Sequence, residues 1–316
     1  MDSFLYSINA TIPIFLVMIL GWLINRWGII DEKFTTKANQ YVFQVALPFL
    51  LFKDIAGADV RSQFDIRFVL FCMGVTTFCF VVIWILTELF MKDDTMKGSF
   101  VQGSFRSSAA ILGLAFIQNM YSDTGMAPLM IVAAVPLYNI YSVIVLTFKA
   151  NHADGAVKTA NIKKACINIC KNPIIIAIFL GLPFSIFEIR FPVIMNKTIN
   201  YVAQTATPIA LLVIGAGFEG RKAIKKLRPT IVGTAIKLVL QAALFLPLAI
   251  WLGFRNQELM AILIMLASPS TVSCYIMAKN MDNDAVLSSS IIVLTTMLSS
   301  ITLTAWIFIL RGLGLV

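Results

Sequence analysis

The sequence has little charge and almost no histidine. Charged residues make up 13% of the 316, about half the share of a soluble domain, while hydrophobic residues make up 59%. A soluble fold of this length needs more polar surface than this composition supplies. The single histidine, His152, stands in a polar stretch, away from any partner that a membrane-embedded protease would need. The composition therefore predicts an integral membrane protein and disfavours an enzyme.

Cysteine is also scarce, with five in the chain. Cys166 and Cys170 are four residues apart, a spacing that can place two metal ligands on one helix face. Because no histidine or carboxylate pair stands near them, two inert thiols are the favoured interpretation. We expect no metal and no cofactor. The N-terminus, Met1-Asp2-Ser3, lacks a basic region and a small-residue cleavage site, so the first apolar stretch is expected to be a span.

Long apolar stretches are plentiful. A membrane helix needs about 20 apolar residues, and ten stretches approach or exceed that length with little or no charge. They are residues 8–24, 38–52, 68–90, 98–122, 124–148, 172–187, 198–218, 229–254, 259–278 and 285–310. The predicted fold class is thus an all-α polytopic membrane protein with ten spans.

The net charge of +9 is a topology signal rather than a sign of nucleic-acid binding. Sixteen lysines and arginines fall in the connections after odd-numbered spans, and seven fall on the opposite side. The side with sixteen is expected to be cytoplasmic, with both termini outside the cell.

The two halves of the chain resemble each other. Residues 41–52, YVFQVALPFLLF, match residues 201–212, YVAQTATPIALL, at six of twelve positions. The same offset of 160 pairs Gly21 with Gly181. We therefore predict two five-span repeats, 1–158 and 159–316. An odd number of spans inverts the second repeat in the membrane, as in many secondary transporters.

Spans four and nine are the predicted site of a helix break. Span nine contains Pro269 in its middle, flanked by hydroxyl side chains that can satisfy freed backbone groups. Span four aligns with it at an offset of 161 and is rich in small residues. An ordinary proline kink with small-residue packing is the alternative. The residues predicted to form a crossing, substrate-binding centre are Arg106, Ser107, Ser108, Ala109, Ser268, Pro269, Ser270 and Thr271.

Arg106 is the only arginine within a predicted span, where a charge costs at least ~2.5 kcal/mol. It is interpreted as an anion ligand or a lock on the broken helix, with a structural ion pair as the alternative. Lys237 in span eight is a similar candidate, although its long stem can also reach an interface. Asn139 in span five is a candidate polar wall residue. Gln44 and Gln204, at equivalent repeat positions, either face the site or bond between helices.

Five local motifs, in spans two, four, six, seven and nine, fit this ten-span arrangement. In chain order they are VALPFLLF, GSFRSSAAILGLA, KNPIIIAIFLG, TPIALLVIGAGFEG and LASPSTVSCYIMAKNMDND. With these motifs the chain resembles the auxin efflux carrier family, in its bacterial form, whose fold is similar to that of bile-acid sodium symporters. The resemblance implies a scaffold of spans 1, 2, 6 and 7 and a moving transport unit of spans 3–5 and 8–10. It also implies a carboxylic acid substrate such as malate, malonate or an auxin-like acid. Family members usually carry asparagine near the span-four break, where this chain has Ser107 and Ser108.

The sequence thus predicts a secondary transporter of a small organic anion in the cell membrane, working by elevator-type alternating access. A passive anion channel or a membrane sensor is the alternative. The coupling ion, Na⁺ or H⁺, stays open, and no buried carboxylate is recognised within a span. The expected partners are the organic anion and the lipid bilayer, with a possible homodimer through the scaffold and no nucleic acid.

Overall fold

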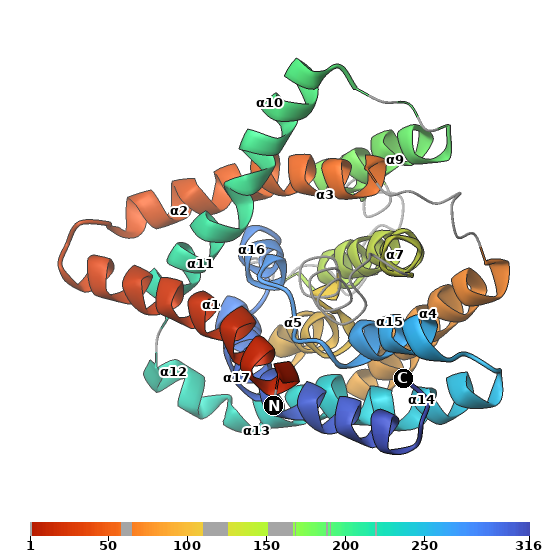
Figure 1. The fold of residues 1–316 in the computed structure, drawn as a ribbon. Helices are drawn as coiled ribbons and strands as arrows, with labels where there is room; N and C mark the ends of the chain where they lie inside the picture. The colour runs from red at the N-terminus through yellow and green to blue at the C-terminus, as the bar shows by residue number, and fades with distance from the viewer. Residues whose placement is uncertain are drawn as a thin grey trace.

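In the part of the chain that the structure describes, all regular secondary structure is helical (Figure 1). The computed structural model describes residues 2–57, 65–109, 126–150, 167, 169–187, 189, 191–218 and 220–316. Five helical stretches there are long and apolar enough to cross a membrane: Ile66–Phe90, Ala127–Phe148, Val193–Ala216, Leu227–Trp251 and Ala285–Gly312. Shorter apolar helices cover Ile12–Arg26, Pro173–Ile186 and Asn256–Ala267.

The helices of the first half follow the predicted spans closely. They are α1 (Asp2–Arg26), α2 (Glu32–Tyr41), the π-helical η1 (Val42–Ala46), α3 (Leu47–Ala56), α4 (Ile66–Phe90), α5 (Asp94–Phe105) and α7 (Ala127–Phe148). Helices α2, η1 and α3 follow one another directly, with no non-helical residue between them. The distal part of the predicted fourth span, residues 110–125, lies outside the described residues.

The second half is also helical in the part that the structure describes. Its helices are α9 (Pro173–Ile186), α10 (Val193–Gln204), α11 (Ala206–Ala216), α12 (Gly220–Lys225), α13 (Leu227–Ala235), the π-helical η3 (Ile236–Leu240), α14 (Gln241–Trp251), α15 (Asn256–Ala267), α16 (Ser273–Asn280) and α17 (Ala285–Gly312).

Several helices begin where a short polar side chain caps the first turn. Asp31 Oδ1 accepts the Phe34 N–H at 2.7 Å, and Asp65 Oδ1 accepts the Arg67 N–H at 2.7 Å. Asn172 and Asp284 cap α9 and α17 in the same way. Because such caps satisfy N–H groups that lack an intrahelical partner, they mark where each apolar helix starts.

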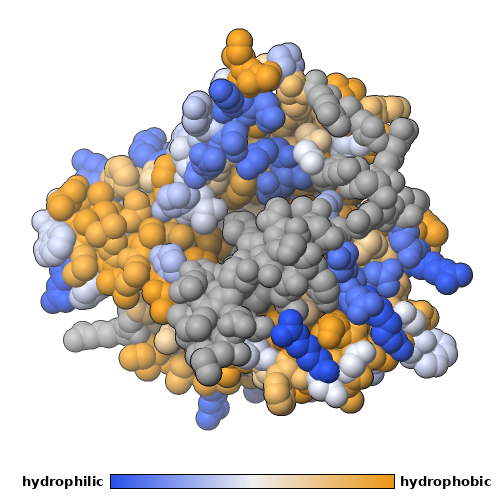
Figure 2. All heavy atoms as spheres, viewed as in Figure 1, coloured by the Kyte–Doolittle hydropathy of each residue, from blue (hydrophilic) through white to orange (hydrophobic). Residues whose placement is uncertain are grey.

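The outer surface is largely apolar. Large side chains such as Phe90, Trp251 and Phe308 are about four-fifths exposed, at 80%, 80% and 78%. Figure 2 shows hydrophobic residues over much of the visible face, beyond the grey region. Exposed apolar area on this scale suits contact with lipid rather than with water.

Helices from the two halves pack against one another. Helix α1 runs along α11, and α3 runs along α9 (Figure 1). The first contact is very close: a Cβ on Gly21 would lie 2.2 Å from Leu212 O, and one on Gly215 would lie 1.9 Å from Met18 O. At the second contact, Gly181 packs against Ile55. The glycines Gly21 and Gly181, paired by the sequence offset, therefore occupy corresponding interhelical contacts.

Two helices stop in the interior of the molecule. Helix α5 ends at Phe105, and Arg106 has an extended backbone, with φ −79° and ψ 142°. Helix α15 ends at Ala267, and α16 begins at Ser273 after a non-helical stretch. Both ends fall at the predicted breaks. The helical part of the second span, in contrast, continues past the predicted end at residue 52 to Ala56, where Gly57 caps it.

Candidate functional site

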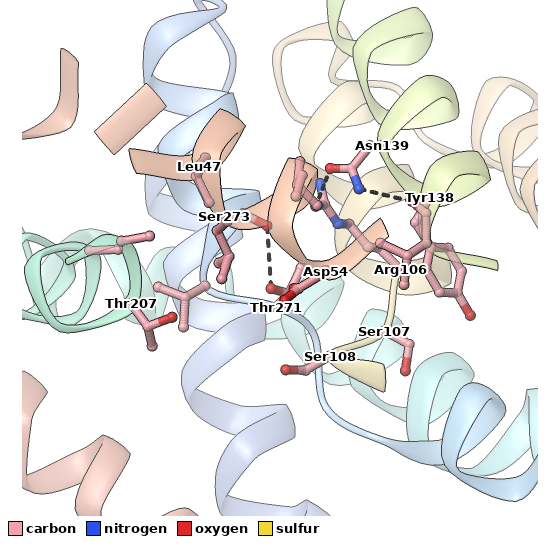
Figure 3. A pocket seen from close by; sticks show the side chains of 16 residues that line it. Leu47, Asp54, Arg106, Ser107, Ser108, Tyr138, Asn139, Thr207, Thr271 and Ser273 are labelled. Carbon is pink, nitrogen blue, oxygen red and sulfur yellow. Dashed lines mark hydrogen bonds between the residues drawn. The ribbon is translucent and has the colours of Figure 1, made fainter. Parts of the chain in front are cut away.

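A small cavity lies where the end of α5 and the non-helical stretch between α15 and α16 face α3 and α11. Its free volume is about 50 Å³, which is room for a few water molecules. Figure 3 shows its lining side chains. They are Leu47, Leu50, Leu51 and Asp54 of α3, Arg106, Ser107 and Ser108 of the first break, Val135, Tyr138 and Asn139 of α7, Ala206, Thr207 and Ala210 of α11, and Thr271, Val272 and Ser273 at the start of α16.

The two helix breaks, at residues 106–108 and 268–272, are joined by hydrogen bonds. The Ser108 N–H donates to Pro269 O at 2.9 Å, and the Ser107 and Ser268 hydroxyls are hydrogen-bonded. The Ser270 hydroxyl donates to Gly103 O near the end of α5. Backbone groups released where helices stop must be satisfied inside a membrane, and these serines do so. Ser268, Pro269 and Ser270 thus form the joint behind the cavity rather than its wall.

Arg106 brings a whole positive charge to the cavity. Its side chain is 4% exposed and donates to Asn139 Oδ1 at 2.6 Å, with further contacts to Ser142 Oγ and Met277 Sδ. Among the described residues no carboxylate forms an ion pair with it. Its contacts are all to neutral groups, and a thioether is a weak acceptor. The structural ion pair that the sequence left open is therefore not found in the described residues.

Hydroxyl groups and a helix start complete the polar part of the wall. Thr271 and Ser273 lie at the N-terminal end of α16, and Thr207 faces them from α11 (Figure 3). A helix N-terminus carries a partial positive charge of roughly half a unit. Arg106 and this end of α16 thus both bring positive charge to the cavity.

Asp54 is a lining residue that the sequence does not single out. The predicted second span ends at residue 52, two residues before it. Helix α3 extends to Ala56, which places the partly buried Asp54 on the cavity wall opposite the breaks. A weak sequence signal for it is its position one turn after Leu50 and Leu51, on the same face of the helix.

Lys237 does not face the cavity and lies instead against the end of α15, just before the joint formed by Ser268, Pro269 and Ser270. It is fully buried, at 0% exposed, and its ammonium donates to Leu266 O at 2.7 Å. It does not line the cavity that Arg106 lines. Gln44 and Gln204 are exposed and also stand away from this cavity, whereas Ala109 is buried directly after Ser108. The structure therefore brings together Arg106, Ser107, Ser108, Asn139 and Thr271 from the predicted set.

Comparison with known proteins agrees with this geometry. The model of a family described as "Membrane transport protein" matches residues 6–307. The chain belongs to this family. The match confirms the resemblance to auxin efflux carriers and makes the chain an integral membrane protein of a transporter family.

Three similar proteins are matched, two of them over nearly their full length. The chain is 22% identical to "Uncharacterized transporter YfdV" of Escherichia coli (strain K12), covering 97% of this chain and 98% of that one. It is 24% identical to the "Putative malonate transporter" of Rhizobium meliloti (strain 1021), covering 96% of each. It is 23% identical to the "Lysosomal cholesterol signaling protein" of Mus musculus over 76% of this chain and 29% of that protein.

Proposed function

We propose that this membrane transport protein is a secondary transporter of a small organic anion, and that Arg106 binds the anion's carboxylate. The observation that carries the proposal is a buried arginine on a cavity wall with only neutral hydrogen-bond partners. Taking a carboxylate out of water requires donors or positive charge. Arg106 offers a planar fork that matches a carboxylate, and the start of α16 adds a partial charge.

The predicted pair of inverted repeats favours alternating access. The packing of α1 on α11 corresponds to the packing of α9 on α3 when each helix is replaced by its counterpart in the other repeat. The π-helical segment Val42–Ala46 and the interruption at Thr205 also fall at matching positions, 160 residues apart. A pseudo-two-fold relation of this kind lets two halves exchange conformations, which converts an outward-open state into an inward-open one.

The position of the cavity supports an elevator-type movement. One wall comes from α3 and α11, in the proposed scaffold of spans 1, 2, 6 and 7. The other wall comes from the breaks and α7, in the proposed transport unit of spans 3–5 and 8–10. Because the cavity is small, the two units must separate to admit an organic anion. Sliding of one unit past the other would then carry the anion across the membrane.

The substrate class follows from the polar groups present. One guanidinium, several hydroxyls and a helix start suit a carboxylate group, which malonate, malate and an auxin-like acid all carry. The name of the Rhizobium relative favours malonate as the first compound to test. Orientation with both termini outside and a homodimer through the scaffold stay predictions.

Uptake into proteoliposomes tests the function. Purified protein is reconstituted, and uptake of radiolabelled malonate, malate and indole-3-acetate is followed under an imposed Na⁺ or H⁺ gradient. A secondary transporter shows saturable uptake that exceeds the equilibrium distribution. Flux that rises linearly with anion concentration and stops at equilibrium would instead identify a passive channel.

A further inference from the structure

Lys237 is a fully buried cation without an acidic partner in the described residues, and the anion cavity does not use it. It lies in the π-helical segment η3, a type of irregularity that is frequent at functional sites. Its ammonium donates to Leu266 O at 2.7 Å and approaches Met265 O and Gln241 Oε1 at 3.4 and 3.3 Å. All of its ligands are therefore neutral oxygens.

Two of these oxygens are backbone carbonyls at the C-terminal end of α15. Leu266 and Met265 are in the last turn of α15, where carbonyls lack an intrahelical partner. Gln241, one turn after Lys237, donates to Ser104 O at the end of α5 at 2.8 Å. Each helix C-terminus carries about half a negative charge, so the two ends together present about one unit. One positive charge would balance these two ends, and the Lys237 ammonium lies directly against the end of α15.

Two further hydroxyl oxygens lie on α13 and α5, two helices that contact η3. The Thr234 hydroxyl, three residues before Lys237, and the Ser104 hydroxyl, beside the end of α5, are buried without a hydrogen-bond partner in the described residues. A Cβ on Gly233 would lie 2.9 Å from Ser104 Oγ, which places these two segments in contact. Carbonyl and hydroxyl oxygens are the ligands that hard cations prefer.

We propose that Lys237 is a built-in substitute for a bound metal cation at the helix joint, so that neither folding nor transport requires Na⁺ or K⁺. Removal of the side chain leaves an oxygen-lined position that an alkali cation can fill. The part concerning transport rests on the proposed function, whereas the part concerning cation binding does not.

The test compares thermal unfolding of the purified protein in NaCl, KCl and choline chloride at equal ionic strength. Wild type is expected to unfold at the same temperature in all three salts. Lys237→Ala is expected to unfold at least ~5 °C earlier in choline chloride and to recover part of that loss in NaCl or KCl, since a bound cation stabilises by mass action. Lys97→Ala, which removes a lysine that is paired with Glu88 outside the joint, is the matched control and should show no cation preference.

A second measurement keeps the proposal testable if Lys237→Ala does not fold. Anion uptake by wild-type proteoliposomes is compared in symmetrical NaCl and choline chloride, and equal rates are expected. A wild type that is stabilised selectively by Na⁺, or whose uptake falls tenfold without it, would overturn the proposal. So would a folded Lys237→Ala protein that responds equally to all three salts. A protein that moves no anion would refute the proposed function while leaving the unfolding test decisive for Lys237.

Discussion

At the scale of single residues, Arg106 decides the anion hypothesis. We expect Arg106→Ala to lower malonate uptake by at least about tenfold, because one hydrogen bond to a charged group contributes about 1.5–3 kcal/mol. Arg106→Lys should also lose most uptake, since a point charge does not reproduce the guanidinium fork. The measurement is initial uptake into proteoliposomes, with the amount of folded protein checked by size-exclusion chromatography.

The control for Arg106 is Arg311→Ala, which removes an exposed arginine in the last turn of α17. It should leave uptake unchanged. Normal uptake by folded Arg106→Ala protein would show that the arginine holds the break rather than the substrate.

Asp54 is expected to act against anion binding. It shares the cavity with Arg106, so an ionised Asp54 repels a bound carboxylate and competes for the guanidinium. At an effective dielectric constant of about 20, the repulsion between two unit charges is about 4 kcal/mol at roughly 4 Å and falls in inverse proportion to their distance. We predict that Asp54→Asn tightens malonate binding by about tenfold in calorimetric titration.

Asp282→Asn is the matched control for this substitution. Asp282 is exposed and has a φ of 52°, a conformation that asparagine tolerates well. The Asp282→Asn variant should bind malonate as tightly as the wild type does. Unchanged or weaker binding by Asp54→Asn would mean that Asp54 does not compete with the anion.

The sequence singles out a residue most readily where it contradicts its surroundings. Arg106 is conspicuous as a charge in an apolar stretch, and the structure places it on the cavity wall with Asn139. Asp54 stands at the end of such a stretch, where a carboxylate is unremarkable, so only the true length of α3 reveals it. Lys237 was conspicuous as well, but the sequence cannot say on which side of the joint a side chain lies.

At the scale of elements, the contact between α1 and α11 depends on glycine. A methyl group at Gly21 would overlap the backbone at Leu212. We predict that Gly21→Ala destabilises the protein by about 1–3 kcal/mol, the usual effect of overpacking, and lowers its unfolding temperature in detergent.

Gly74 in α4 offers a matched substitution, because nothing lies within 4 Å of a Cβ built there. Gly74→Ala should be neutral or should stabilise the helix by up to about 1 kcal/mol. Equal unfolding temperatures for the two variants would contradict the close packing of α1 on α11.

The helices themselves were largely predictable, because apolar length and polar caps mark them in the sequence. The break in the ninth span follows from Pro269, which cannot donate a backbone hydrogen bond. The end of α5 at Phe105 has no proline, and only its alignment with the ninth span indicated it. The π-helical segments η1 and η3 left no sequence signal, because an extra residue within a turn is set by tertiary packing.

At the scale of the whole molecule, the charge distribution predicts orientation. A single cysteine placed at Lys225, in the basic segment between the seventh and eighth spans, should be shielded from a membrane-impermeant maleimide in intact cells. A single cysteine at Leu313, near the C-terminus, should react. Both are introduced after replacing the five native cysteines, and labelling in lysed cells controls for access. Reaction at Lys225 without reaction at Leu313 would reverse the orientation.

The pairing of α1 with α11 has a consequence for how the protein is made. Gly21 and Leu212, which meet at that contact, are separated by nearly 200 residues of chain. At synthesis rates of about 5–20 residues per second, α1 waits roughly 10–40 s in the membrane before its partner emerges. During that interval its glycine-bearing face can be covered only by lipid or by an insertion factor. Cells that synthesise this protein slowly, or that stop synthesis before residue 212, should therefore accumulate a first half that is inserted but incompletely packed.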